Sequence, residues 1–253
     1  MKPAARQYGL PGFEFDDYVQ DAIAFLRRNE PTTAGYFVGF SGGKDSIVTL
    51  DLVRRSGVKY VAGYNCTGID YPEIPRFIRR YYPDVAFIFP KESYWRLLHK
   101  YGPPRRTIRW CCNCLKEGNT PYKKCVFGIR AEESYRRAAR GRISTYQGKT
   151  TYKPIFHWPE WAVWQYIEEN SLPYPSLYDE GATRIGCMGC PFALCGSSWA
   201  KATRREAEMA RFPSWYKLHR KISREWFERT QQAHPEKYHV RDFETFYRAY
   251  WLN

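Results

Sequence analysis

The chain has 253 residues, of which 43% are hydrophobic and 18% aromatic. This composition is enough to bury a core and excludes a largely disordered protein. No apolar run approaches the roughly 20 residues of a membrane-spanning helix, and the first residues lack the apolar segment of a signal peptide. We therefore expect a cytoplasmic protein with no membrane partner.

The formal net charge is +14, and it is unevenly distributed. Between Lys91 and Lys149 there are 15 Lys and Arg residues against 4 Asp and Glu, and from Trp199 to Asn253 there are 12 against 7. Such an excess suits a polyanionic partner such as nucleic acid. A solvated basic face that only keeps the protein soluble is an equally good interpretation of the charge alone.

In chain order, the first predicted element is an amphipathic helix over Asp16–Asn29. The apolar, β-prone segment Gly35–Phe40 is predicted to form a strand, and the segment Ile47–Val53 a helix. The glycine-rich loop 41–46 lies between them. Strand, glycine-rich loop and helix in this order are typical of a phosphate-binding site.

Three further buried strands are predicted over Val58–Tyr64, Val85–Phe89 and Lys124–Ile129, with a helix over Glu73–Tyr82. Alternating strands and helices predict an α/β fold with a doubly wound parallel sheet, which binds ligands at the carboxyl ends of its strands. We expect this Rossmann-like, nucleotide-binding domain to cover residues 1–153.

The remaining residues, 154–253, are expected to form a smaller, cysteine-containing helical extension packed on that domain. One of its predicted helices covers Glu160–Asn170. A later segment carries apolar residues at helical spacing, which favours core packing over base stacking. These residues are Trp215, Leu218, Ile222 and Trp226.

The glycine-rich loop consists of Ser41, Gly42, Gly43, Lys44, Asp45 and Ser46. Small side chains let backbone N–H groups approach a pyrophosphate at a helix N-terminus, and Lys44 adds a positive charge. The loop is not the P-loop of kinases, because Asp45 stands where that motif requires Ser or Thr. A helix cap at Asp45 and a simple Gly-Gly turn are the structural alternatives.

Several motifs follow one another between about Gly35 and Gly196. They are Ser41–Ser46, Thr67–Glu73, Gly128–Ser134, Pro154-Ile155 with Trp158 and Val163-Trp164, Tyr178–Gly181, and Ile185-Gly186-Cys187. In these motifs and in their order the chain resembles the phosphoadenosine phosphosulfate (PAPS) reductase family of N-type ATP pyrophosphatases, within the adenine nucleotide α-hydrolase-like superfamily.

The resemblance implies that the loop 41–46 binds the phosphates of ATP. It also implies that Arg130, Glu133 and Ser134 lie close to the nucleotide at the end of a later strand, with Gly128 as a further nucleotide-binding residue. An Arg can bind phosphate oxygens as a fork, and nearby carboxylates can hold Mg²⁺ or water. The expected catalytic residues are Lys44, Asp45, Asp70, Arg130 and Glu133, with Asp45 and Asp70 as the candidates for positioning Mg²⁺ or water.

Eight cysteines in a cytosolic protein predict thiols, catalytic groups or metal ligands. Two clusters, 111–114 and 187–190, fit either zinc or an iron–sulfur centre by spacing alone. Iron–sulfur members of the family carry a Cys-Cys pair before a Lys, here Lys116, and a C-x-x-C pair. The resemblance thus implies a [4Fe–4S] cluster on Cys111, Cys112, Cys187 and Cys190.

Four cysteines lie outside this pattern. Cys114 and Cys195 are extra, and either could replace a ligand or carry sulfur. Cys66 and Cys125 lie in apolar segments and are expected to be small buried hydrophobes.

The resemblance leaves several functions open. Sulfonucleotide reductases use a cysteine in a C-terminal Glu-Cys-Gly-Leu/Ile-His motif, and no cysteine follows Cys195 in this sequence. Reduction of adenosine phosphosulfate (APS) or PAPS is therefore an alternative that needs Cys114 or Cys195 as a substitute. A non-catalytic, iron–sulfur nucleic-acid-binding module is another, although the intact phosphate loop argues against it.

The favoured function is that of an ATP pyrophosphatase of sulfurtransferase type. The chain resembles the ATP-hydrolysing component of DNA phosphorothioation systems, which adenylylates an oxygen of a nucleic acid so that sulfur can displace AMP. This implies DNA as the favoured acceptor, a cysteine desulfurase as sulfur donor, and other modification-system proteins as partners. A tRNA thiolation enzyme is a related alternative.

Overall fold

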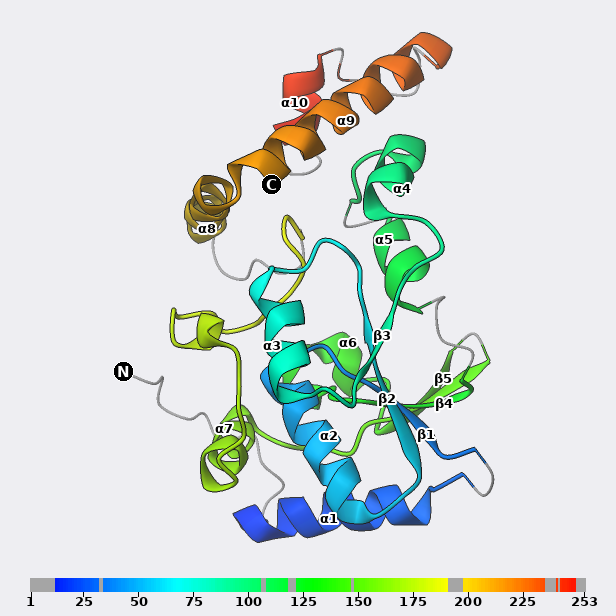
Figure 1. Cartoon of the computed structure of the whole chain (residues 1–253), viewed down its shortest axis with the longest axis vertical. Helices are drawn as coiled ribbons and strands as arrows, with labels where there is room; N and C mark the ends of the chain where they lie inside the picture. Colours follow the sequence, from blue (N-terminus) through cyan, green and yellow to red (C-terminus); the bar gives the residue numbers. More distant parts are fainter. Residues whose placement is uncertain are drawn as a thin grey trace. The chain divides into compact units, whose positions relative to one another are not determined.

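The computed structural model describes residues 12–31, 34–105, 108–117, 122–146, 148–190, 198–234, 240 and 242–248. The chain forms two compact units, each assembled from separate segments of sequence (Figure 1). The first unit comprises Met1–Asn65, Pro72–Ile88 and Pro121–Thr183, and the second Cys66–Tyr71, Phe89–Thr120 and Arg184–Asn253.

This division differs from the expected boundary at residue 153. A sheet strand ends at Tyr152, and the next helix belongs to the same unit as the sheet. The first unit thus continues to Thr183. The two shorter segments of the second unit, Cys66–Tyr71 and Phe89–Thr120, each follow a strand of the sheet in the sequence.

The first unit contains a six-stranded sheet with the order β3-β2-β1-β4-β6-β5. Its strands are β1 (Tyr36–Gly39), β2 (Tyr60–Asn65), β3 (Ala86–Ile88), β4 (Lys124–Phe127), β5 (Ile143–Tyr146) and β6 (Lys149–Tyr152). All pairs are parallel except β5 with β6. The structure confirms the predicted α/β fold with a mostly parallel sheet, and the four predicted strands are present.

Helices accompany the sheet in the first unit. They are α1 (Phe15–Arg28), α2 (Lys44–Ser56), α3 (Glu73–Tyr81), α6 (Tyr135–Ala138) and α7 (Glu160–Glu169), with 3₁₀ turns η2 (Ala131–Glu133) and η3 (Ser176–Tyr178). Helix α2 packs against both α1 and α7. Strand β1 is central, and its Tyr36, Phe37 and Val38 are buried on both faces, as in parallel sheets covered by helices. The glycine-rich loop therefore starts from a rigid strand.

The β5–β6 hairpin was not among the predicted elements. Its strands have the sequences Ile-Ser-Thr-Tyr and Lys-Thr-Thr-Tyr, which lack a continuous apolar run. β5 lies at the edge of the sheet and has a neighbouring strand on one side only. Such a strand gives a weak hydrophobic signal in the sequence.

The second unit is helical. It contains α4 (Tyr94–Tyr101), α5 (Trp110–Cys112), the π-helical turn η1 (Asn113–Glu117), α8 (Ser198–Arg211), α9 (Pro213–Ala233) and α10 (Phe243–Tyr247). Helix α9 packs against α4 and α10. One cluster of buried side chains consists of Tyr216, Trp226, Phe227, Phe243, Phe246 and Tyr247. A second consists of Ile69, Tyr94, Leu97, Leu98, Trp110 and Leu115.

The apolar stripe predicted on α9 is partly wrong. Trp226 is buried, and Trp215 and Ile222 pack against the aromatic clusters, but Leu218 is 40% exposed. The side chains of Tyr216 and His219 are buried on this helix instead, which moves the buried face of α9 away from Leu218. Among the described residues, no helix combines the length and apolar character needed to cross a membrane.

Candidate functional site

The glycine-rich loop connects β1 to the N-terminus of α2. Gly42 has a φ of 73°, in the left-handed region that favours glycine. A Cβ at this position would also lie 3.2 Å from Cγ2 of Ile74. Gly43 is the N-cap of α2 and makes no side-chain cap. Hydroxyl groups accept from backbone N–H groups here instead, Ser41 Oγ from Gly43 at 3.4 Å and the Tyr178 hydroxyl from Lys44 at 3.0 Å. An anion bound at the N-terminus of α2 would replace these neutral acceptors.

Ser46 stabilises the shape of the loop. Its hydroxyl accepts a hydrogen bond from the Ser41 backbone N–H at 3.2 Å and donates one to the Gly43 carbonyl at 2.8 Å. The side chain is buried. Ser46 thus holds the turn from within, which is a different role from the nucleotide contact expected of it.

Lys44 is buried at the start of α2 and is surrounded by acceptors. Its Nζ lies 3.3 Å from a carboxylate oxygen of Asp45 and 3.3 Å from one of Glu160. Nζ also donates to the Thr183 carbonyl at 3.4 Å, and the Lys44 backbone N–H donates to the Tyr178 hydroxyl at 3.0 Å. The ammonium group is therefore held in place beside the loop.

Asp45 and Arg130 form an ion pair in which Arg130 Nε lies 2.5 Å from Asp45 Oδ1; the Arg130 side chain is buried and that of Asp45 is 18% exposed. Burial acts to raise the pKa of the Asp45 carboxyl, but the charges of Lys44 and Arg130 outweigh it and lower the pKa below its usual value. Both carboxylate oxygens of Asp45 thus face cations. Both oxygens that could bind Mg²⁺ are therefore already paired. The carboxylate of Asp45 pairs with cations and does not act as a helix cap.

The pair is close because β4 ends against the start of α2. A Cβ on Gly128 would lie 2.5 Å from the Asp45 carbonyl oxygen, so only glycine permits this approach. Arg130 also pairs with Glu132. Gly128 therefore acts through the backbone, and Arg130 is brought to the loop as predicted.

Glu133 and Ser134 organise the turn that carries Arg130. Glu133 accepts a hydrogen bond from the Arg130 backbone N–H at 3.1 Å and pairs with Arg137. The Ser134 hydroxyl accepts from the Arg137 N–H at 3.3 Å and caps α6. In this structure the two side chains support the site from within the chain.

Three side chains of this site were not predicted to have a role there. Tyr178 and Glu132 lie within family-like motifs, so the sequence contained a signal for them. Glu160 stands at the first position of α7 and gives no such signal. Its position beside Lys44 results from the packing of α7 against α2.

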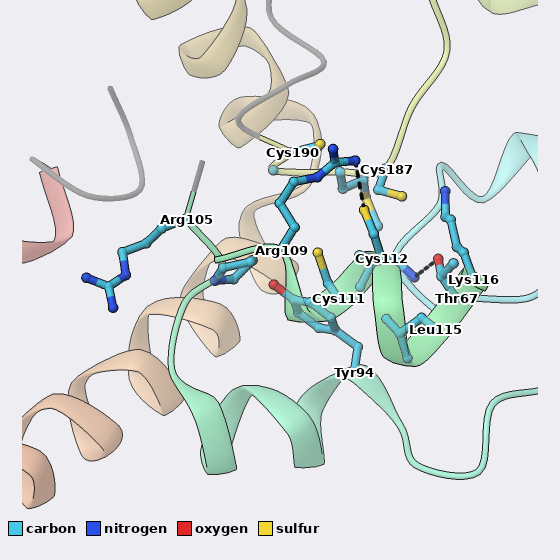
Figure 2. Close-up of a pocket in the computed structure, with 14 residues that line it drawn as sticks. Thr67, Tyr94, Arg105, Arg109, Cys111, Cys112, Leu115, Lys116, Cys187 and Cys190 are labelled. Carbon is cyan, nitrogen blue, oxygen red and sulfur yellow. Dashed lines mark hydrogen bonds between the residues drawn. The ribbon is translucent and has the colours of Figure 1, made fainter. Parts of the chain in front are cut away.

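The second unit contains a pocket lined by all four cysteines that were predicted to bind metal (Figure 2). Cys111 and Cys112 come from α5, and Cys187 and Cys190 from the turn before residue 191. Arg109 extends toward Cys112 and donates to its Sγ at 3.4 Å (Figure 2). The structure therefore brings the two predicted clusters together.

Charged groups lie among these thiols. Hydrogen bonding from Cys111 lowers the pKa of Cys112, with burial opposing and Arg109 assisting. Burial raises the pKa of Cys187 to about 12. Burial acts against the charge of Lys116, but Cys187 and Asp70 outweigh it and raise the Lys116 pKa above its usual value. Arg109 and Lys116 thus act to favour the thiolates that bind metal, whereas burial acts against the thiolate at Cys187.

Asp70 lies in this second unit, beside Cys187 of the cysteine pocket. Its Oδ2 accepts a hydrogen bond from the Thr67 hydroxyl at 2.8 Å, and its Oδ1 accepts one from Cys187 Sγ at 3.5 Å. Its backbone pairs with Cys187 as an isolated antiparallel bridge. The side chain expected to act on ATP thus contacts a thiol.

Four cysteines in one pocket form a donor set that fits a thiolate-bound metal centre, either zinc or iron–sulfur. Within the described part of the chain, however, no group of three or more His, Cys, Asp or Glu side chains is arranged as a metal site. The pocket thus holds the right ligand types without preformed coordination geometry.

The other cysteines have different surroundings. Cys114 packs against the cluster that contains Tyr94 and Trp110 and does not line the pocket. Cys125 is buried in β4, as expected, whereas Cys66 follows β2 and is half-buried. Cys195 lies outside the described residues.

Comparison with known proteins identifies a family and several relatives. The sequence model of the phosphoadenosine phosphosulfate reductase domain matches residues 35–193. An uncharacterized protein of Methanocaldococcus jannaschii is 33% identical over 233 residues, which are 85% of this chain and 47% of that protein. The chain thus spans about half the length of this relative.

An adenosine 5'-phosphosulfate reductase of Shouchella clausii is 33% identical over 202 residues, which cover 73% of this chain and 83% of the relative. Among solved structures, a phosphoadenylyl-sulfate reductase from Candida auris in a phosphate complex has a TM-score of 0.54 and 20% identity. It covers 72% of this chain and 97% of its own. At this identity the likeness establishes the fold.

Proposed function

The chain belongs to the phosphoadenosine phosphosulfate reductase domain family, and from this membership we propose that it is an ATP pyrophosphatase that activates a nucleic acid for sulfur incorporation. The carrying observation is the loop 41–46, where a helix N-terminus with a glycine N-cap adjoins Lys44 and the Asp45–Arg130 pair. Backbone N–H groups and two cations in one place suit the phosphates of ATP.

In this function the phosphates of ATP lie against the N-terminus of α2. An oxygen of the acceptor attacks the α-phosphorus, and pyrophosphate leaves with the electron pair of the broken P–O bond. Lys44 and Arg130 offset the negative charge that develops on the phosphate oxygens. The terminal sulfur of a persulfide supplied by a desulfurase then attacks the activated acceptor atom, and AMP leaves with the electron pair of the broken bond. A second thiol cleaves the resulting S–S bond, which leaves the sulfur on the acceptor and forms a disulfide as the oxidised product. Mg²⁺ would enter with ATP, because Asp45 is already paired.

A nucleic-acid acceptor is supported by α6, which follows the Arg130 turn in the same unit. Tyr135 is 88% exposed, and Arg136 and Arg140 are exposed beside it in the sequence. An exposed aromatic ring with neighbouring cations suits single-stranded nucleic acid, where bases stack and phosphates pair with arginine. We favour DNA as the acceptor, with tRNA as the alternative.

The cysteine pocket is proposed to hold a [4Fe–4S] cluster on Cys111, Cys112, Cys187 and Cys190. When bound, such a cluster supplies a redox-active, sulfur-rich centre whose potential depends on nearby hydrogen bonds and charge. Arg109 and Lys116 are the residues of this chain that provide such interactions.

Reduction of APS is the second candidate, because the Shouchella clausii relative carries that name at 33% identity. One experiment separates the two functions. Protein purified without oxygen is given ATP with DNA, with tRNA or with neither, and pyrophosphate is measured. A parallel sample is given APS or PAPS with thioredoxin, and sulfite is measured. Pyrophosphate release that nucleic acid stimulates supports our proposal, whereas sulfite release without pyrophosphate formation contradicts it.

A further inference from the structure

The C-x-x-C turn of the cysteine pocket is held by a buried carboxylate from another helix. Glu208 of α8 directs Oε1 at this turn and accepts a hydrogen bond from the Gly189 backbone N–H at 3.0 Å. Gly189 lies between Cys187 and Cys190 and has a φ of 67°. The Cys190 N–H donates to the Cys187 carbonyl at 3.2 Å, which closes the turn. Glu208 therefore binds the middle of the segment that presents both thiols.

The same carboxylate oxygen binds the segment that pairs with this turn. The Tyr71 hydroxyl donates to Glu208 Oε1 at 2.9 Å. Tyr71 directly follows Asp70, whose backbone forms the antiparallel bridge to Cys187. On the far side of the bridge, the Met188 N–H donates to the Ile69 carbonyl at 2.7 Å. One oxygen of Glu208 thus connects both strands of the bridge.

The second oxygen of Glu208 fixes the carboxylate itself. Arg205 Nη1 donates to Oε2 at 2.9 Å, and the Tyr216 hydroxyl donates to it at 2.6 Å. The Arg205 and Glu208 side chains are 4% and 8% exposed. Burial raises the pKa of Tyr71 and of Tyr216, with the Glu208 charge adding to the effect, so both remain donors. Four donors to one buried carboxylate leave it little freedom to move.

We propose that Glu208 is a positioning residue for the Cys187–Cys190 thiols, acting through the Gly189 N–H and Tyr71. Residues behind metal ligands commonly fix the ligands' direction, and here the fixed group is the turn rather than a ligand side chain. The cysteines of α5 donate no hydrogen bond to Glu208 in the described structure. This role is independent of the reaction that the protein catalyses.

The test removes Glu208 together with Arg205, because loss of the carboxylate alone would leave a buried unpaired charge. In Arg205→Met/Glu208→Met, reduced and metal-free, alkylation of Cys187 and Cys190 by iodoacetamide is expected to be at least about tenfold faster than in the wild type. Rates at Cys111 and Cys112 are expected to stay unchanged. Mass spectrometry resolves the four sites. With Zn²⁺ as the probe ion, competition with a chelator is expected to show about tenfold to hundredfold weaker binding.

One variant serves as the control. Glu206→Gln, at an exposed position of α8, is expected to change nothing. If the double variant is unfolded by circular dichroism, Glu208→Gln replaces it. Its amide oxygen is a weaker acceptor, so hydrogen exchange at the Gly189 amide is expected to be faster.

Wild-type rates at Cys187 and Cys190 in a folded double variant would overturn the positioning role. A uniform increase at all four cysteines would overturn it too, because that result indicates general loosening of the unit. In Glu208→Gln, hydrogen exchange at the Gly189 amide that is as slow as in the wild type would also overturn the positioning role.

Discussion

At the scale of residues, the site in the first unit depends on how buried charges are paired. Lys44 and Arg130 flank Asp45, and Glu160 and Glu132 complete the group. Buried ions are costly unless each has partners with good geometry. The arrangement therefore fixes two cations beside the glycine-rich loop before any phosphate arrives, which is the electrostatic preorganisation that phosphate chemistry requires.

Lys44 is the residue whose loss should affect catalysis most directly. In Lys44→Met, pyrophosphate release from ATP is expected to fall by about a hundredfold or more, because one positive charge at the phosphates is removed. The exposed Lys59→Met is the matched control and is expected to keep wild-type activity. Stopped assays of pyrophosphate against ATP concentration test this. Full activity in Lys44→Met would remove the lysine from the mechanism.

The Asp45–Arg130 pair predicts a pH-dependent contribution to stability. The pKa of Asp45 is lowered in the folded state, so its ion pairs stabilise the fold above the unfolded-state pKa of about 4. This stabilisation is lost as the pH falls through the folded-state pKa. Asp45→Asn is therefore expected to lower the free energy of unfolding by about 3–5 kcal/mol at pH 7. The difference from wild type should shrink below about pH 4.

Urea unfolding at several pH values measures this dependence. The control is Asp84→Asn, which breaks the half-exposed pair with Arg54 and should cost no more than about 1 kcal/mol. An Asp45→Asn effect that is equally small, or that does not change with pH, would contradict a buried and ionised Asp45.

At the scale of elements, short segments place the functional groups. The tight contact of β4 with α2 at Gly128 brings Arg130 to Asp45, and a one-turn helix, α6, follows at once. α6 is too short to be stable alone and is held by the Ser134 cap and the Arg137–Glu133 pair. Its exposed side chains are therefore presented on a fixed turn.

This geometry predicts how α6 contributes to nucleic-acid binding. The triple variant Tyr135→Ala/Arg136→Ala/Arg140→Ala is expected to bind single-stranded DNA at least about tenfold more weakly, because a stacking ring and two phosphate contacts are lost. The slope of log affinity against log salt concentration should also become shallower. Fluorescence anisotropy at several salt concentrations measures both quantities.

The control for α6 is Tyr81→Ala, an exposed aromatic of α3. It is expected to leave DNA affinity unchanged. If DNA affinity and its salt dependence were unchanged in the triple variant, α6 would not take part in nucleic-acid binding. Pyrophosphate release by the variant would not alter that conclusion.

At the scale of the whole molecule, the two units are stabilised differently. The first has a sheet buried by helices, whereas the second joins three separate segments through helices, aromatic clusters and the cysteine pocket. A metal bound by Cys111, Cys112, Cys187 and Cys190 would cross-link two of these segments. Binding to the folded state alone stabilises that state by mass action.

Metal removal is therefore expected to loosen the second unit selectively. Hydrogen exchange after treatment with a chelator should accelerate at residues 110–117 and 187–190, and remain unchanged in β1 and β4. Cys190→Ser should reproduce this effect, whereas Cys114→Ser, which alters a thiol outside the pocket, should retain the metal. As purified without oxygen, the protein should be brown and contain iron and sulfide. A colourless protein with stoichiometric zinc would contradict the cluster.

The sequence alone determined the local chemistry of this protein. Apolar runs predicted four sheet strands, glycine and lysine at fixed spacing predicted the loop 41–46, and two cysteine clusters predicted a common pocket. These features depend on residue type and on the spacing of residues along the chain, and a single sequence shows both.

Only the tertiary structure decided how these parts are grouped. It brought Asp70 to Cys187, paired both oxygens of Asp45 with cations, and brought Glu160 to Lys44 and Glu208 to Gly189. It also moved the unit boundary from residue 153 and added the β5–β6 hairpin. Residues far apart in the sequence meet only when whole helices and strands pack together, and the spacing of residues in the sequence does not show which of them meet. The free energy of a buried charge depends on these partners, so it too is decided by the tertiary structure.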